Sequence, residues 1–148
     1  MPCRQLWERH NMEKTFTILK PDTVKAGNAG AIIQVLEREG FKIRAMKMLH
    51  LSQAQAEGFY YVHKERPFFG SLVKFMTEGP IIAVVLESDD AIQKLRKVMG
   101  ATDPAKADAG TIRKLFATNI ERNAIHGSDG PDTAAYEISY FFNRLEIV

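Results

Sequence analysis

The sequence has a single cysteine, Cys3, among its 148 residues. One thiol cannot form an intramolecular disulfide, and it cannot supply the ligands of a zinc ribbon or a cysteine-rich scaffold. Long apolar segments are also missing, because the longest apolar run, 81–86, is far too short to cross a bilayer. The N-terminal eleven residues lack the apolar centre of a secretory signal. We therefore expect a reducing compartment, with the cytoplasm as the default location.

Neither sign of charge dominates the chain. The 20 lysines and arginines stand against 18 aspartates and glutamates, so the formal charge is +2, and no block of one sign resembles a polyanion-binding tail. This length and 45% hydrophobic residues suffice for one packed core and barely for two. We expect one domain at 12–148, which begins at a second possible start, Met12. Residues 1–11 are then an N-terminal extension or a remnant of an expression vector.

The usual signatures of nucleotide and hydrolase sites are absent. The sequence contains no G-x-x-x-x-G-K-[ST] and no G-x-G-x-x-G, so any nucleotide is held in another way. It also contains no H-E-x-x-H, no G-x-S-x-G and no cysteine pair. Zinc protease, serine hydrolase and redox functions therefore have no support.

The hydrophobic pattern predicts short strands that alternate with helices. Ser52 and Gln55 have the spacing of a capping box, and a change of phase near Ala45 indicates a β-bulge. Strands are expected at 15–19, from Phe41, at 81–86 and at 124–126. Helices are expected at 31–39, from Ser52 through Tyr60, and at 68–76, 91–99 and 133–142.

The order of these elements predicts an α+β sandwich. Strands occur in two pairs separated by helices, an order that suits a small sheet covered on one face by helices. The run 81–86 does not alternate, which is typical of a strand buried on both faces. The stretch 100–110 is a long irregular loop, and such loops in compact domains are usually functional.

Among four histidines, His126 has the most suggestive surroundings. His10 lies in the expected extension, while His50 ends a strand and His63 lies among charged residues, so both are expected to be solvated. His126 ends a short apolar segment, and the turn-rich residues 127–130 follow it. That turn would expose the ring beside free backbone amides. His126 is therefore the best candidate for a nucleophile.

A histidine of this kind can transfer a phosphate. An ordinary imidazole, with a pKa of ~6.5, is about three-quarters neutral at pH 7, so its free nitrogen can attack phosphorus without a separate base. The reaction then needs positioning and cations, which Lys20, Arg96 and Arg113 could supply. Spacing alone favours ordinary solvated charges for these three. It equally favours core packing for Tyr60 and Phe68 over a base-stacking platform.

Five segments stand in a fixed order along the chain. They are Thr17-Ile18-Leu19-Lys20-Pro21-Asp22, Arg66-Pro67-Phe68-Phe69, Met99-Gly100-Ala101-Thr102-Asp103-Pro104, Gly110-Thr111-Ile112-Arg113 and Asn123-Ala124-Ile125-His126-Gly127-Ser128-Asp129. In this order and spacing the sequence resembles the nucleoside diphosphate kinase family, from about residue 13 to 142. The N-x-x-H-G-S-D segment is specific to that family.

The resemblance implies a fold and a reaction. The fold is a ferredoxin-like sandwich with a four-stranded antiparallel sheet and helices packed on it. In the reaction, His126 takes the γ-phosphate of a nucleoside triphosphate and passes it to a nucleoside diphosphate in a ping-pong exchange. Glu137 and Ser128 correspond to the residues that orient the His126 ring, and Tyr60 corresponds to a hydroxyl beside the phosphorylated ring.

The resemblance also implies the contacts to the nucleotide. Lys20 corresponds to the lysine that contacts the sugar hydroxyl and the phosphates, and Asn123 to the partner of the ribose. Arg96 and Thr102 correspond to contacts with the β-phosphate. Arg113 corresponds to a contact with the phosphates near the reacting centre.

Three further expectations follow from the resemblance. The base stacks on Phe68, with Leu72 and Ile120 beside it, and stacking tolerates every base because each has a π-face. Mg²⁺ is held mainly by the nucleotide phosphates, whose oxygens it prefers to an all-protein cage. Family members assemble through shared dimers into tetramers or hexamers, so a homo-oligomer is expected.

The sequence departs from the family pattern at Lys114, Leu115 and Gly130, where the family usually has a small residue, an aspartate and a serine. These departures put in doubt the packing behind Arg113 and any regulation at position 130.

A second hypothesis is a nucleic-acid or protein binding module on the same fold, but a charge of +2 predicts weak, salt-sensitive nucleic-acid binding. A purely structural pseudo-enzyme usually lacks the histidine, which is present here.

Overall fold

The computed structural model describes residues 12–148, so the expected extension at 1–11 lies outside the described residues. The described chain forms one antiparallel sheet in the order β2-β3-β1-β4, with the two long central strands paired along their length. This is the expected α+β, ferredoxin-like sandwich. The strands are β1 (Met12–Leu19), β2 (Lys42–Leu49), β3 (Ile81–Asp89) and β4 (Ile125–Gly127).

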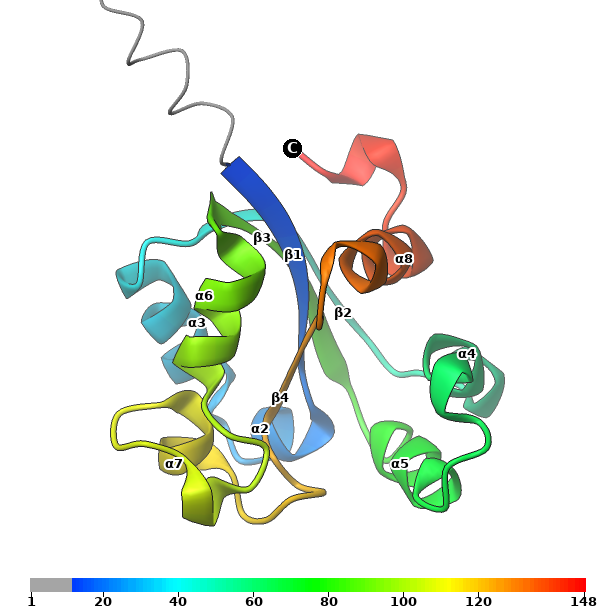
Figure 1. Ribbon diagram of the computed structural model, residues 1–148. Coiled ribbons are helices and arrows are strands. Elements are labelled where there is room, and N and C mark those ends of the chain that lie inside the picture. Colours follow the sequence, from blue (N-terminus) through cyan, green and yellow to red (C-terminus); the bar gives the residue numbers. More distant parts are fainter. Residues whose placement is uncertain (1–11) are drawn as a thin grey trace, which may run out of the picture.

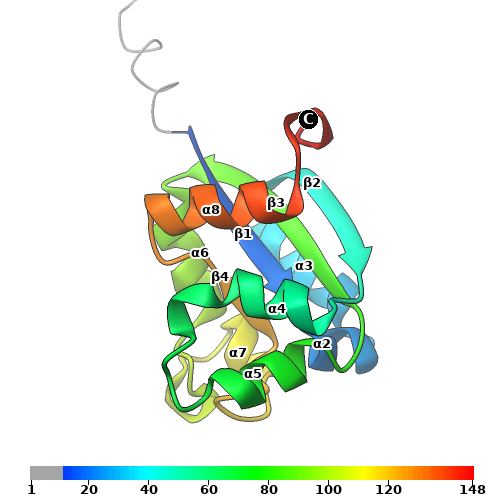
Figure 2. The same ribbon diagram turned by 90° about the vertical axis from the view of Figure 1, so that its right-hand side faces the viewer.

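Helices cover both faces of the sheet, so the expectation that they cover only one face was wrong. In Figure 1, α3 and α6 lie on one side of the sheet, and α4, α5 and α8 lie on the other, which Figure 2 turns toward the viewer. The helices are α2 (Pro21–Lys25), α3 (Ala29–Arg38), α4 (Gln53–Phe59), α5 (Phe69–Met76), α6 (Ala91–Met99), α7 (Ile112–Phe116) and α8 (Pro131–Phe141). Short 3₁₀ turns are η2 (Tyr61–His63), η3 (Pro104–Lys106) and η4 (Arg144–Glu146).

The run at the start of β3 explains the two-sided cover. Ile81, Ala83 and Val85 belong to the core beneath α4, α5 and α8. Their neighbours Ile82 and Val84 belong to the core beneath α3, α6 and α7. Because successive side chains of a strand point to opposite faces, an apolar run without alternation requires a hydrophobic layer on each side.

Local signals in the sequence are confirmed at several element ends. The register of β2 against β3 shifts between Ile43 and Ala45, as expected for a bulge. Ser52 and Gln55 form the capping box at the start of α4, with a 2.9 Å bond from the Ser52 backbone N to Gln55 Oε1. In contrast, α2 and α7 were not predicted, because five-residue helices are too short to show a helical period.

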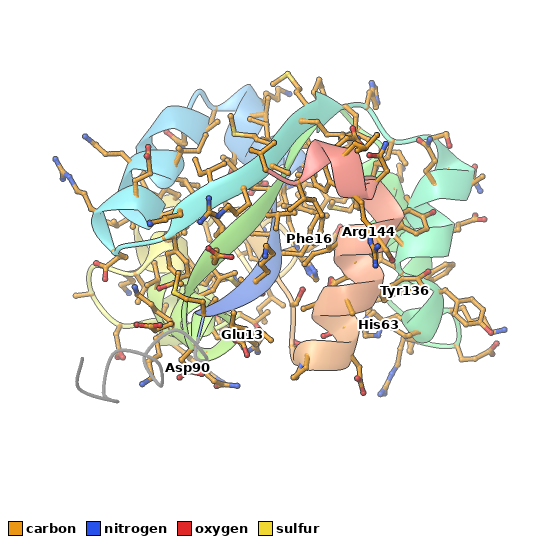
Figure 3. The ribbon with its side chains drawn as sticks, turned by 90° about the horizontal axis from the view of Figure 1, so that it is seen from above. Glu13, Phe16, His63, Asp90, Tyr136 and Arg144 are labelled. Atoms are coloured by element: carbon orange, nitrogen blue, oxygen red, sulfur yellow. The ribbon has the colours of Figure 1, made fainter. Side chains whose placement is uncertain are left out.

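The start of α6 is tied to the sheet by an acidic side chain from another element. Asp90 adopts a left-handed conformation, with φ of 49°, and its side chain does not cap the helix. Instead, Glu13 on β1, which Figure 3 labels, accepts through Oε1 a 2.8 Å hydrogen bond from the Ile92 backbone N. A carboxylate at a helix N-terminus satisfies free N–H groups and complements the dipole. This contact places Arg96, one turn further along α6, relative to the central strands.

None of the helices within residues 12–148 has both the length and the apolar character needed to cross a membrane.

Candidate active site

The base of the site is formed where β1 ends and β4 begins. Lys20 follows β1, and its backbone N donates a 3.0 Å hydrogen bond to the carbonyl of Ala124. Ala124 has a φ of 74°, which is rare for a residue with a side chain. Its carbonyl also accepts from Thr23 Oγ1 at 2.8 Å, and its N–H donates to Asp22 Oδ2 at 3.1 Å. These bonds hold a strained turn directly before His126, a placement that is common in functional sites.

His126 is held from behind by an acidic side chain. Its Nε2 forms a hydrogen bond with Glu137 Oε1 from α8. Glu137 Oε2 accepts a 2.7 Å bond from Ser128 Oγ. Since an ionised carboxylate only accepts, Nε2 carries the proton and Nδ1 keeps the lone pair. The His126 side chain remains 22% exposed whereas that of Glu137 is 8% exposed, so the ring is held firmly and still reached from outside.

Two buried cations lie at the base of the site. Lys20, 6% exposed, donates from Nζ to Asn123 Oδ1 at 2.8 Å. Burial, and after it the charge of Arg113, lowers the pKa of Lys20 to about 8. Arg113, 7% exposed, donates to the carbonyls of Gly100 at 3.0 Å and Ile125 at 2.9 Å, and its Nε has no partner within residues 12–148. Burial followed by the charge of nearby Arg96 lowers the pKa of Arg113 to about 10.

These cations repel one another, so the site is prepared for an anion. Bringing positive charges together in a partly dry cleft is unfavourable until negative charge arrives. Arg96 has an acidic partner, Asp129, at 2.8 Å, but both side chains are well exposed. An exposed pair of this kind contributes little stability and can be replaced by a phosphate contact at small cost.

A cavity of about 630 Å³ joins the cations to His126 and to the aromatic residues above it. All the expected site residues line it except Ser128 and Glu137, which lie behind the His126 ring. The expected residues along its wall are Lys20, Tyr60, Phe68, Leu72, Arg96, Thr102, Arg113, Ile120, Asn123 and His126. A volume of this size fits a nucleotide-sized ligand.

Residues that the sequence did not single out also line the cavity. Gly127 and Asp129 lie inside the N-x-x-H-G-S-D segment, so the motif itself could have pointed to them. His63 was expected to be solvated, but it is half-buried, and its ring lies 5.6 Å from that of Phe68. Ser71 and Glu121 complete the wall, and neither carries a signal in the sequence.

Tyr60 closes the side of the cavity next to the histidine. Its ring centroid lies 6.2 Å from that of His126, at nearly a right angle. The hydroxyl is buried, with no hydrogen-bond partner within residues 12–148. Burial, and to a smaller extent the charge of Glu137, raises the pKa of this phenol well above its usual range. Tyr60 is therefore a neutral donor facing the cleft.

The departures from the family pattern do not disturb this geometry. Lys114 and Leu115 are exposed on α7, away from the buried guanidinium of Arg113. Gly130 has an extended backbone, with φ of −164°, and a Cβ there would meet no atom within 4 Å. A serine would fit at that position.

Comparison with known proteins identifies the family of the chain. The family model described as nucleoside diphosphate kinase matches residues 13–147. The chain belongs to the nucleoside diphosphate kinase family. The nucleoside diphosphate kinases of Geobacter sp. (strain M21) and Desulfosudis oleivorans are 58% and 59% identical to it over 137 residues, which cover 93% of this chain and 100% and 99% of those proteins.

Solved structures of nucleoside diphosphate kinases share the fold. The enzyme of Aquifex aeolicus superposes with a TM-score of 0.91 at 46% identity, covering 93% of this chain and 99% of that one. The halophilic enzyme of Halobacterium salinarum, in complex with CDP, superposes with a TM-score of 0.88 at 40% identity, covering 92% and 91%. The chain is thus an enzyme of this family, a nucleotide-dependent phosphotransferase with a phosphohistidine mechanism.

Proposed function

We propose that His126 is the residue that carries the phosphate in this nucleoside diphosphate kinase, and that Nδ1 is the nitrogen that forms the bond to phosphorus. The observation that supports this choice best is the contact between Nε2 and Glu137, which leaves Nδ1 as the ring nitrogen with a lone pair. The ring also lines the same cavity as Lys20, Arg96 and Arg113.

The exchange then takes place in two symmetrical halves. The Nδ1 lone pair forms a bond to the γ phosphorus while the bond from phosphorus to the β–γ bridging oxygen breaks, and the electron pair leaves with the diphosphate. A second diphosphate uses its terminal oxygen to reverse these steps and regenerate the free imidazole. Glu137 compensates the positive charge that the ring acquires while the P–N bond exists.

The cations of the cleft stabilise the charge that moves during transfer. Arg96 and Thr102 are proposed to bind the β-phosphate, and Arg113 the phosphates near the reacting centre. Lys20 binds phosphate and sugar oxygens, and its bond to Asn123 supports a shared position at the ribose. Preorganised donors of this kind need no reorganisation during the reaction.

The outer end of the cavity is proposed to hold the base. Phe68 is 48% exposed and Ile120 is 59% exposed, although both line the cavity with Leu72. Large apolar side chains that stay this exposed gain contacts when a flat ring is inserted between them. Because stacking reads only the π-face, we expect purines and pyrimidines to be accepted alike.

The substrate is proposed to be the Mg²⁺ complex of the nucleotide. Within residues 12–148 no group of three or more His, Cys, Asp or Glu side chains is arranged to hold a metal ion. A cleft lined by Lys20, Arg96 and Arg113 repels a free divalent cation, so the ion arrives with the phosphates that coordinate it. The chain contributes positioning, and the ion neutralises part of the phosphate charge.

We also propose three properties of the whole protein. Residues 12–148 form the single catalytic domain. The chain assembles through dimers into a tetramer or hexamer, as the resemblance implies. It acts in the cytoplasm, a location that the single cysteine supports.

Labelling with γ-³²P ATP tests the central proposal. The protein should acquire label that is stable in alkali and lost in acid, and His126→Ala should abolish both labelling and exchange. His50→Ala is the matched control, because His50 bonds to the carbonyl of Thr77 and does not line the cavity. Normal exchange by His126→Ala would refute the assignment.

A further inference from the structure

Two tyrosines of α8 are bonded to the backbone of α4. Tyr136 and Tyr140 lie one turn apart on the same face of α8. The Tyr136 hydroxyl donates to the carbonyl of Gly58 at 2.8 Å, and the Tyr140 hydroxyl donates to the carbonyl of Gln55 at 2.7 Å. Figure 3 shows Tyr136 between the two helices.

The bond to Gly58 occupies a carbonyl that the helix leaves without a partner. Gly58 lies in the last turn of α4, where carbonyls lose their intrahelical donors. No backbone N–H of the turns and loops within residues 12–148 donates to it. Tyr136 therefore acts as a C-terminal cap that comes from another helix.

Gly58 also fits Tyr140 closely. A Cβ at this position would overlap the Tyr140 hydroxyl and would lie 3.3 Å from Cζ of its ring. The φ of Gly58 is not positive, so its backbone conformation does not explain the glycine. Glycine at this position lets the tyrosine approach the helix backbone, so the contact between α4 and α8 is closer than side chains would allow.

The end of α4 leads directly into the wall of the active site. Phe59 is its last residue, and its ring stands edge-on to that of His126 at 5.4 Å and to that of Tyr140 at 5.8 Å. Tyr60 follows at the C-cap, with its ring 4.8 Å from that of Phe59. A shift of the last turn of α4 therefore moves Tyr60 relative to the histidine.

The helix that carries the two tyrosines also contacts the opposite side of the His126 ring. Glu137, which holds Nε2 of His126, is the residue next to Tyr136 on α8. One helix thus carries both the acid behind the imidazole and the hydroxyls that fix the wall in front of it. Apolar contacts between two helices have no preferred direction, so they would not by themselves fix the distance between Tyr60 and the His126 ring. Hydrogen bonds are directional and can fix it.

We propose that Tyr136 and Tyr140 are positioning residues for phosphoryl transfer. Their hydroxyls fix α4 to α8, at Gly58 in the last turn of α4 and at Gln55 in its first, and thereby set the distance between Tyr60 and the His126 imidazole. Neither tyrosine touches the substrate in this scheme, and both act through Tyr60. The inference rests on the proposed role of His126.

The variants Tyr136→Phe and Tyr140→Phe test this proposal, because they remove the hydroxyl and keep the ring. Rapid-quench labelling with γ-³²P ATP gives two quantities, the label per chain and the rate constant of labelling. We expect the label per chain to stay at the wild-type value. The rate constant should fall about fivefold for each variant, the factor that corresponds to one hydrogen bond of average strength.

Tyr61→Phe is the matched control, since Tyr61 follows the same helix, is 57% exposed and makes no bond to α8. It should label at the wild-type rate. In a Tyr60→Phe background, the change Tyr136→Phe should have little further effect if it acts through Tyr60. The Tyr140→Phe variant repeats the same comparison should Tyr136→Phe fold poorly.

Three results would overturn the proposal. The first is an unchanged rate constant of labelling in both variants. The second is that Tyr136→Phe lowers the rate constant in the Tyr60→Phe background as much as it does in the wild type. The third is a smaller fraction of labelled chains that react at the normal rate. The last result would mean that the hydroxyls serve folding alone. Failure of the proposed function is distinct, because the wild-type protein itself would then acquire no label at His126.

Discussion

The carboxylate of Glu137 bridges His126 and Ser128, with one oxygen on the imidazole Nε2 and the other accepting from the Ser128 hydroxyl at 2.7 Å. Its negative charge lies next to a ring that becomes cationic when Nδ1 is phosphorylated. We predict that Glu137→Gln lowers the rate constant of His126 labelling about 10²-fold, because the amide keeps the shape and loses the charge. Rapid-quench labelling measures this rate.

The control for that prediction is Ser128→Ala. It removes one bond to the carboxylate and leaves the negative charge, so we expect a loss of about tenfold. ¹⁵N NMR of the histidines should show the proton on Nε2 in both variants. A larger loss in Ser128→Ala than in Glu137→Gln would mean that orientation outweighs charge.

The loss of the proton from Lys20 should set the alkaline limit of nucleotide binding. Burial and the charge of Arg113 lower its pKa to about 8, so the free enzyme loses this cation as the pH rises through about 8. The ratio kcat/KM, which reports the free enzyme, should therefore fall above that pH. Bound phosphates favour the charged form, so kcat should fall only at higher pH.

Lys20→Arg provides the comparison, because a guanidinium keeps its charge over this range. Its kcat/KM should be lower than that of the wild type at pH 7, since the bond to Asn123 needs a compact ammonium. Its profile should nevertheless stay flat between pH 7 and 9. A wild-type profile that is equally flat would show that Lys20 does not titrate in this range.

The parts of the fold that could be predicted are those whose signal lies within a few neighbouring residues. The apolar run at 81–86 predicted a strand covered on both faces, and the change of phase at Ala45 predicted the bulge. The side on which each helix packs depends on long-range contacts, so the order of the elements wrongly predicted helices on one face only. The helices α2 and α7 have five residues each, so they end before a helical period can appear.

The site is harder to predict, because its residues are far apart in the sequence. Lys20 and Asn123 are separated by 103 positions, and spacing could not join them. Only the family resemblance placed them together. His63 was misjudged because its neighbours are charged, whereas the 3₁₀ turn directs its ring against Phe68. The tyrosines of α8 lie in the predicted helix 133–142, but nothing in the sequence indicated what they contact.

Removal of divalent ions should stop the reaction and leave the protein folded. We have proposed that the ion is held by the nucleotide phosphates and not by the protein. We predict that EDTA abolishes labelling by ATP, that excess Mg²⁺ restores it, and that the melting temperature without nucleotide is unchanged. A drop in the melting temperature on adding EDTA would instead reveal a structural metal.

Phe68 should govern the KM for nucleotides and contribute little to stability. Its ring is 48% exposed and lines the cavity, so truncation leaves the two cores intact. Base stacking contributes about 1–3 kcal/mol, and Phe68→Ala should therefore raise the KM by roughly 5- to 150-fold for ATP and CTP alike. Steady-state kinetics with both nucleotides measures the effect, and an increase for ATP only would contradict recognition by stacking.

Phe69→Ala separates binding from folding at the neighbouring position. Phe69 packs against the core beneath α4, α5 and α8 and does not line the cavity. Its truncation removes buried apolar contacts, so the melting temperature should fall while the KM stays close to that of the wild type. The two adjacent phenylalanines should thus give opposite results in the two measurements. If Phe68→Ala lowered the melting temperature as much as Phe69→Ala and left the KM unchanged, Phe68 would be a core residue and the base would bind elsewhere.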